Sequence, residues 1–123
     1  MGRLTEMDSH VTLFQQMAAT GGGPVVLINK FDVALEDTDQ FLKAWTADAE
    51  VMKRQPGFIS TQLHRGIAGS GVFMNCAVWE STHHFKQAFM NPEFQSKLKD
   101  YPASADASPH LFRKIAVPGI CVE

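Results

Sequence analysis

The sequence predicts a single α+β domain with the split βαβ, ferredoxin-like order of strands and helices. Short apolar, β-branched runs alternate with helical patterns in the order strand, helix, strand, strand, helix, strand. The chain has 123 residues, of which 45% are hydrophobic and 20% are charged, as is typical of one globular domain. We therefore expect an antiparallel sheet with helices on one face.

The first 23 residues are expected to form an N-terminal arm with a glycine hinge, ahead of a domain at 24–123. The helix-capping pair Asp8-Ser9 precedes apolar residues at helical spacing over 11–18, which predicts a short helix. Three glycines and Pro24 then break the pattern. The sequence leaves open whether the arm wraps a partner subunit or is disordered.

The run from Val25 to Phe31 predicts the first strand, and it is apolar on both faces. A strand that is apolar on both faces is covered on both. In a domain of this size, helices would cover one face and a second subunit the other. We therefore expect two sheets to pack face to face in a homodimeric α+β barrel.

The longest helix is predicted over 36–55, where Phe41, Trp45 and Met52 form one stripe, and it ends before Pro56-Gly57. A second strand follows at 58–64. The glycine-rich segment 65–71 lacks the order of a dinucleotide-binding fingerprint, so we expect a hairpin connection.

A third strand is predicted from Val72 to Trp79, and Ser81 is the expected cap of the next helix. Asn91-Pro92 interrupts that helix, and Pro92 suits the first turn of a new one. We expect a loop at 102–109 and a fourth strand from Leu111 to Val117.

Charge and cysteine content exclude several classes of function. The net charge is −2, so nucleic acid is not expected as a partner. Cys76 and Cys121 are far apart and form no metal-binding or disulfide framework. No signal peptide or membrane-spanning run is evident, and we expect a cytoplasmic protein with no membrane partner.

Three motifs resemble the antibiotic biosynthesis monooxygenase domain family, part of the dimeric α+β barrel superfamily. They are the turn Gln55-Pro56-Gly57-Phe58, the strand-to-helix junction Val78-Trp79-Glu80-Ser81 and the break Asn91-Pro92-Glu93-Phe94. Their order and spacing extend the resemblance from about Pro24 to Val117. It implies dimeric barrels with a ligand pocket between the sheet and the helices.

The resemblance implies several possible activities. Some members oxidise polyketide anthrones with molecular oxygen and no cofactor, others degrade heme, and others act on quinones or signalling molecules. The heme-degrading branch carries a tryptophan and a histidine at positions that correspond here to about Ala88 and Leu98. Neither residue matches, so the axial iron ligand is absent and this branch is disfavoured.

Asn29 is the sharpest candidate for a catalytic residue. A carboxamide lies here in the middle of an apolar strand, on the face of Leu27 and Phe31. Burying an unpartnered amide costs about 1–3 kcal/mol, so something must satisfy it. Either nearby backbone or water does so, or Asn29 binds a substrate carbonyl or a developing oxyanion. The resemblance favours the second interpretation.

Two histidines are candidates for a catalytic base. His64 ends the second strand on the face of Ser60 and Gln62, which we expect to line a polar part of the pocket. His84 flanks the apolar stripe of its helix, where it can reach the pocket rim, although a surface position is the favoured interpretation. Adjacent histidines on a helix point about 100° apart, so His83 and His84 predict no metal site.

Aromatic side chains are expected either to form the core or to line a site for a flat substrate. The candidates for substrate binding are Phe31, Trp45, Phe85, Phe89 and Phe94. The resulting prediction is a monooxygenase that needs no cofactor and uses oxygen on a small aromatic or polyketide-like molecule. The alternatives are a ligand-binding or stress-response barrel without catalysis, and a heme-degrading, isomerase or cyclase relative.

Overall fold

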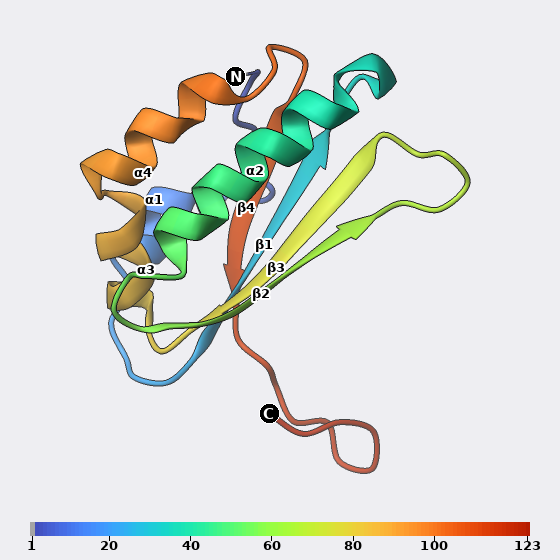
Figure 1. Cartoon of the computed structure of the whole chain (residues 1–123). Helices are drawn as coiled ribbons and strands as arrows, with labels where there is room; N and C mark the ends of the chain where they lie inside the picture. The colour runs from blue at the N-terminus through green and yellow to red at the C-terminus, as the bar shows by residue number, and fades with distance from the viewer. Residues whose placement is uncertain (1) are drawn as a thin grey trace.

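The computed structural model describes residues 2–123 and contains one four-stranded antiparallel sheet. The strands are β1 (Val25–Asp32), β2 (Phe58–Arg65), β3 (Val72–Trp79) and β4 (Asp106–Phe112). Their order in the sheet is β2-β3-β1-β4, which places the first and third strands in the centre. This arrangement confirms the predicted α+β, ferredoxin-like fold (Figure 1).

The helices lie where the sequence signals predict them. They are α1 (Leu13–Met17), α2 (Thr38–Met52), α3 (Thr82–Phe89) and α4 (Pro92–Lys97), with single 3-10 turns η1 (Leu35–Asp37) and η2 (Leu98–Asp100). The predicted Ser81 cap is confirmed, since its hydroxyl accepts from the N–H of His84. The predicted break at Asn91-Pro92 is also confirmed, and there the side chain of Asn91 caps α4 by accepting from the N–H of Glu93. Helices α2, α3 and α4 cover one face of the sheet (Figure 1).

The arm helix begins later than predicted. Its cap is Thr12, whose side chain forms a reciprocal capping box with Gln15, and not the Asp8-Ser9 pair. Leu13 and Met17 are its buried residues. These two large side chains lie one turn apart and pack into the core, whereas Val11 and Phe14 are exposed.

The arm lies along the outer edge of β4 in its own chain. The N–H groups of Gly2 and Thr5 donate to the carbonyls of Ala105 and Ala107, and the N–H of Ala107 donates to Arg3. Further along, Gln16 accepts from the N–H of Leu111 and donates to its carbonyl. The arm therefore satisfies an edge that would otherwise present unpaired backbone groups.

The fourth strand is the main correction to the predicted elements. It runs from Asp106 to Phe112, so half of the segment expected to be a loop belongs to it, and the predicted strand beyond Phe112 does not form. The N–H groups of Ala107 and Leu111 point outward to the arm, so the missing N–H of Pro109 falls on the same outer side. Proline is tolerated in an edge strand under that condition.

The turn between α2 and β2 needs glycine. Gly57 has a φ of +84°, in the left-handed region that other residues rarely adopt. A Cβ atom there would also collide with the ring of His84. The turn is followed by a β-bulge between Phe58 and Ser60.

This bulge decides which face of β2 meets the helices. Phe58 and Thr61 both line the pocket side, whereas Ser60, Gln62 and His64 pair with residues of β3 on the opposite face. Because side chains alternate along a strand, one extra residue exchanges the two faces beyond it.

The opposite face of the sheet carries no helix and is called the open face here. Its centre is formed by half-buried apolar side chains from the two central strands: Val26, Ile28, Met74, Cys76 and Val78. Its rim on β2 is polar. The expectation that the central strands are apolar on both sides is confirmed, and a second chain remains a prediction.

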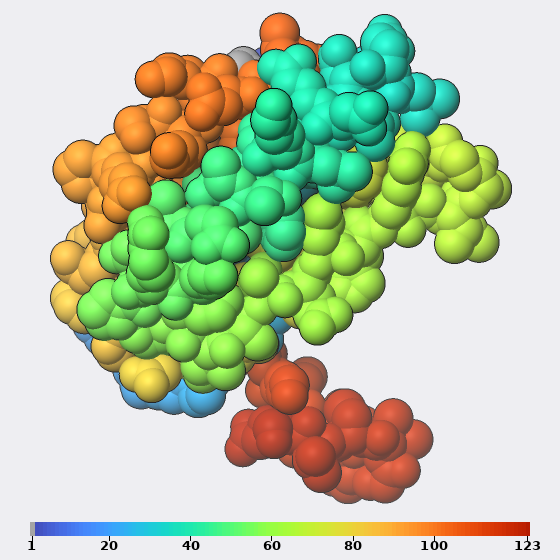
Figure 2. All heavy atoms as spheres, in the orientation of Figure 1, coloured from blue at the N-terminus to red at the C-terminus, as the bar shows by residue number. Residues whose placement is uncertain are grey.

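The last residues leave the body of the molecule. Residues after Phe112 form a tail that projects away from the domain and ends in a small turn held by hydrogen bonds between Val117 and Cys121 (Figures 1 and 2). Ile115, Ile120 and Val122 are strongly exposed on it. Across residues 2–123, no helix has the length and apolar character needed to cross a membrane.

Candidate functional site

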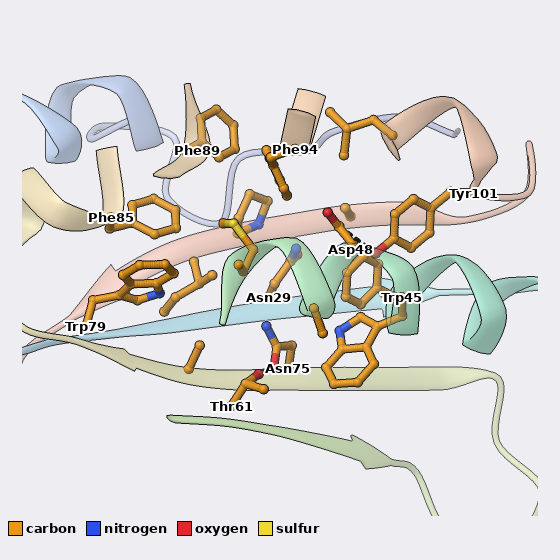
Figure 3. A pocket seen from close by; sticks show the side chains of 18 of the residues that line it. Asn29, Trp45, Asp48, Thr61, Asn75, Trp79, Phe85, Phe89, Phe94 and Tyr101 are labelled. Atoms are coloured by element: carbon orange, nitrogen blue, oxygen red, sulfur yellow. Dashed lines mark hydrogen bonds between the residues drawn. The ribbon is translucent and has the colours of Figure 1, made fainter. Parts of the chain in front are cut away.

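A pocket lies between the helices and the covered face of the sheet (Figure 3). Each of the four strands contributes to its floor, helices α2, α3 and α4 contribute to its walls, and the arm adds one residue. Its lining is Leu4, Leu27, Asn29, Phe31, Trp45, Asp48, Ala49, Met52, Phe58, Thr61, Asn75, Ala77, Trp79, Phe85, Phe89, Phe94, Leu98, Tyr101, Ala107 and Pro109.

Aromatic rings dominate the walls. All five residues that the sequence marks for substrate binding line the pocket: Phe31, Trp45, Phe85, Phe89 and Phe94. Phe85 packs on Phe89 with 5.7 Å between ring centres, and Phe89 packs on Phe94 at 5.5 Å. The rings belong to both the core and the pocket wall, and their binding of a flat substrate stays a prediction.

Two carboxamides lie side by side on the pocket floor. Asn29 of β1 is paired directly with Asn75 of β3, and both side chains line the pocket. Thr61 donates its hydroxyl proton to Oδ1 of Asn75 at 2.6 Å, which leaves the NH₂ group of Asn75 free for the pocket. Oδ1 of Asn29 is buried without a partner. Figure 3 shows both amides rising from the sheet into the cavity.

A buried carboxyl group from the helix layer also lines the pocket. Asp48 lies on α2, one turn after Trp45, and is 8% exposed. Its Oδ2 accepts from the hydroxyl of Tyr101 at 2.9 Å, and its Oδ1 is buried without a partner. The hydrogen bond from Tyr101 therefore leaves one carboxylate oxygen without a partner in a residue that lines the pocket.

Burial raises the pKa of Asp48 from its ordinary value of 3.8 to about 6. The hydrogen bond from Tyr101 and the charge of Lys97 act in the opposite direction but do not cancel this effect. Burial, and then the neighbouring carboxylate, raise the pKa of the Tyr101 hydroxyl above its usual range. Tyr101 is therefore a permanent donor to Asp48 at neutral pH.

Unpartnered buried polar atoms concentrate in this pocket. Within the described residues there are four such side-chain atoms, and three belong to pocket residues: Oδ1 of Asn29, Oδ1 of Asp48 and Nε1 of Trp79. The fourth is Nδ1 of His110, which lies beside the arm. Native proteins satisfy most buried polar groups, so such a cluster indicates a ligand or water site.

The two candidate histidines do not reach the pocket. His64 lies on the open face, where Nδ1 is 3.3 Å from the carbonyl oxygen of Met74. His84 lies outside the lining, with Nδ1 2.7 Å from the Ser81 hydroxyl. The expectation that they face the cavity is wrong: the β2 bulge turns His64 away, and the capping hydroxyl holds the ring of His84.

Four polar pocket residues were missed by sequence reasoning: Thr61, Asn75, Asp48 and Tyr101. Two of them carried a usable signal. Asn75 interrupts an apolar strand as Asn29 does, and Asp48 falls on the buried stripe of α2 with Phe41. A polar side chain at a core position is the informative observation in both cases.

The pocket does not fit the heme chemistry of one branch of the resemblance. Its lining contains no histidine, and Ala88 and Leu98 stand where that branch carries its tryptophan and histidine. In the part of the chain that the structure describes, no group of three or more His, Cys, Asp and Glu side chains could hold a metal ion.

The fold and the pocket define the class of protein: a ferredoxin-like α+β domain with a mostly aromatic pocket between sheet and helices. Residues 24–98 match the Antibiotic biosynthesis monooxygenase family, and the chain belongs to this family. The family assignment made from the sequence motifs is thus confirmed. No curated protein matches the sequence.

Solved structures show the same fold. A proposed monooxygenase from Shewanella loihica is 32% identical with a TM-score of 0.67, covering 80% of this chain and 100% of that one. SnoaB, a cofactor-independent oxygenase from Streptomyces nogalater, is 24% identical with a TM-score of 0.69, covering 79% and 98%. A proposed antibiotic biosynthesis monooxygenase from Caulobacter crescentus is 20% identical with a TM-score of 0.67, covering 78% and 92%.

Proposed function

We propose that this protein is a cofactor-independent monooxygenase that oxidises a small aromatic or polyketide-like substrate with molecular oxygen. The observation that carries the proposal is the set of unpartnered polar atoms of Asn29, Asp48 and Trp79 in an otherwise aromatic pocket. A flat molecule with hydroxyl substituents would satisfy them while stacking on the rings, because a hydroxyl can donate to the two Oδ1 atoms and accept from Nε1 of Trp79. Family membership supports the reaction class.

The paired amides supply the electrostatic part of the mechanism. When an acidic proton leaves the substrate, negative charge develops on its carbonyl oxygen. The NH₂ groups of Asn29 and Asn75 would donate to that oxygen, because the floor of the pocket holds the two residues opposite one another. Donors that are fixed before the reaction stabilise such an anion more than mobile water does. The electron-rich anion then reduces oxygen directly.

The proposed reaction converts an anthrone-like methylene to a ketone. One oxygen atom of O₂ becomes the new carbonyl and the other leaves as water, with both methylene protons released. The electrons come from the substrate, so the balance requires no external reductant. We expect oxygen uptake and quinone formation in equal amounts.

The first test is oxygen consumption by metal-stripped protein with an anthrone. We expect the unsubstituted protein to consume oxygen. The rate of Asn29→Ala should be at least tenfold lower, because the loss of one oxyanion donor has an effect of this size or more. The matched control is Gln62→Ala, which removes a carboxamide from the open face. Unchanged turnover in Asn29→Ala would contradict the role of the amide.

A non-catalytic ligand-binding barrel is the second candidate function. It is favoured by the absence of any histidine from the pocket lining. Binding of the anthrone, seen as quenching of tryptophan fluorescence, without oxygen uptake would replace the oxygenase proposal with this one. An isomerase or cyclase would consume substrate without consuming oxygen.

We also propose that the protein is a homodimer built on the open face. The apolar centre of that face is left without helices, whereas the other face is fully occupied by the pocket and core. Two copies packed face to face would cover it symmetrically.

A further inference from the structure

We propose that Asp48 is the proton acceptor and donor of the reaction, and that Tyr101 positions it. This inference rests on the proposed oxygenase function and names the base that function requires. The sequence directed attention to histidines, but the structure brings neither candidate to the pocket.

The carboxylate is presented to the pocket through one oxygen only. The Tyr101 hydroxyl holds Oδ2 at 2.9 Å, so the free lone pairs of the group are those of Oδ1. Oδ1 is buried, unpartnered and part of a residue that lines the pocket. Asp48 reaches the pocket from α2, whereas Asn29 and Asn75 reach it from the sheet (Figure 3). A molecule bound in the pocket would lie between the helix layer, which carries the base, and the sheet, which carries the anion-stabilising donors.

A carboxylate at this position is costly unless a ligand uses it. Ionised side chains are rarely buried without a countercharge, and a hydrophobic residue would pack more favourably on this stripe. Lys97 acts on Asp48 through its charge, but no ion pair joins the two within the described residues. The Tyr101 bond uses only one oxygen of the carboxylate, and the other oxygen is left without a partner in a residue that lines the pocket.

The surroundings of Asp48 also give its carboxylate the basicity that proton abstraction needs. With a pKa near 6, Asp48 is mostly ionised at neutral pH and binds a proton more tightly than an exposed carboxylate. The groups that act on it are the Tyr101 hydroxyl and the Lys97 ammonium, and both lower its pKa. A base whose pKa lies close to the working pH can both take up a proton and return it.

The proton moves in a closed cycle. Oδ1 takes one methylene proton as the C–H bond breaks, and the electron pair moves onto the substrate carbonyl oxygen. The anion transfers electrons to O₂ and a C–O bond forms, giving a peroxide that recovers the proton from Asp48. Asp48 then takes the second methylene proton, whose electron pair forms the new C=O bond as the O–O bond breaks. Hydroxide leaves with that proton as water.

Proton abstraction can be measured without oxygen. Anthrone would be incubated anaerobically in D₂O with saturating protein, and exchange of its methylene protons would be followed by NMR. We expect catalysed exchange by the natural sequence and at least a tenfold slower rate in Asp48→Asn, which retains an acceptor for the Tyr101 hydroxyl. Quenching of tryptophan fluorescence would verify that the variant still binds anthrone, and Asp39→Asn, an exposed position early in α2, is the control.

The outcomes separate this inference from the proposed function. If proton exchange depends on Asp48 but the protein consumes no oxygen, the result would support Asp48 as the base and refute the oxygenase function. Oxygen uptake with undiminished exchange in Asp48→Asn would refute the base alone. If the protein binds anthrone but its methylene protons exchange no faster than those of anthrone in buffer alone, the inference would be overturned.

The role of Tyr101 is tested by the pH profile. Tyr101→Phe removes a hydrogen bond that lowers the pKa of Asp48, so the acidic limb of the exchange rate should move to higher pH. A purely structural tyrosine would change the rate at every pH and leave the limb where it is. A limb that stays in place, or that persists in Asp48→Asn, would contradict the assignment.

Discussion

The buried carboxyl group of Asp48 lowers the stability of the fold at neutral pH but supplies the proposed base. Its carboxyl group lies on the buried stripe of α2, where its pKa rises from 3.8 to about 6. This difference corresponds to roughly 3 kcal/mol, as an upper bound, between the protonated and ionised forms in the fold. Because the folded protein binds the proton more tightly than the unfolded chain, this stability is present below about pH 4 and is lost as the pH rises through 6.

We therefore predict that Asp48→Asn stabilises the protein at high pH. The variant should unfold at a higher denaturant concentration than the natural sequence at pH 8, and this difference should shrink toward zero at pH 4. Urea unfolding at the two pH values measures the effect. A variant that is less stable at pH 8 would show that the carboxylate is structurally required.

A neighbouring prediction concerns the orientation of Asn75. Thr61→Val removes the hydroxyl that fixes Oδ1 of Asn75, so the amide is free to turn its oxygen toward the pocket. We expect a loss of turnover of about tenfold with little change in stability, in line with the effect of other supporting contacts. Ser60→Ala is the matched control, because it removes a hydroxyl from the adjacent position on the open face. Equal rates in the two variants would argue against an oriented amide.

Among the elements, the arm and the edge strand depend on one another. The sequence offers two fates for the arm, a partner's surface or disorder, and the structure gives a third. The arm covers the edge of β4 and places Leu4 in the pocket wall. Its central contact is Gln16, whose amide bonds to both backbone groups of Leu111 at 2.9 and 3.0 Å.

We predict that Gln16→Ala destabilises the protein by about 1–3 kcal/mol. The substitution leaves the N–H and carbonyl of the buried Leu111 without partners, which costs their desolvation. Urea unfolding measures the change, and Gln87→Ala on the exposed surface of α3 is the control. No difference between the two variants would mean that the arm is not held at this point.

At the scale of the whole molecule, nothing within one chain covers the apolar centre of the open face. Its two central strands carry apolar side chains at the middle of the sheet, with Val78 opposite Val26 on β1 and Ser60 on β2. The tail carries further exposed apolar side chains, such as Ile120. An apolar patch of this kind indicates a protein partner, and the proposed homodimer would cover it.

We predict that Val78→Lys converts a dimer to monomers, since it places a charge at the centre of the proposed interface. Analytical ultracentrifugation of the natural sequence and the variant measures the mass in solution. Gln87→Lys introduces the same charge on the helical side and should leave the dimer intact. A natural sequence that sediments as a monomer would refute the homodimer.

The sequence by itself determined the order of elements, the Ser81 cap of α3, the break before α4 and the apolar character of both faces of the central strands. These depend on local chemistry: β-branched runs, Ser81 and Asn91 at helix starts, and the Asn91-Pro92 break. The carboxamide of Asn29 and the aromatic lining were also predictable, because their faces follow from strand and helix periodicity.

Three features depended on the tertiary structure, because the local sequence pattern does not determine them. Pro109 is compatible with β4 only because its missing N–H lies on the outer edge, which depends on which strand pairs with which. The bulge after Phe58 exchanges the faces of β2 and removes His64 from the pocket. Asp48 and Tyr101 are 53 residues apart, and only the packing of α2 against the segment after α4 brings them into one hydrogen bond. Contacts between distant segments depend on the assembled core, and these contacts position the proposed base.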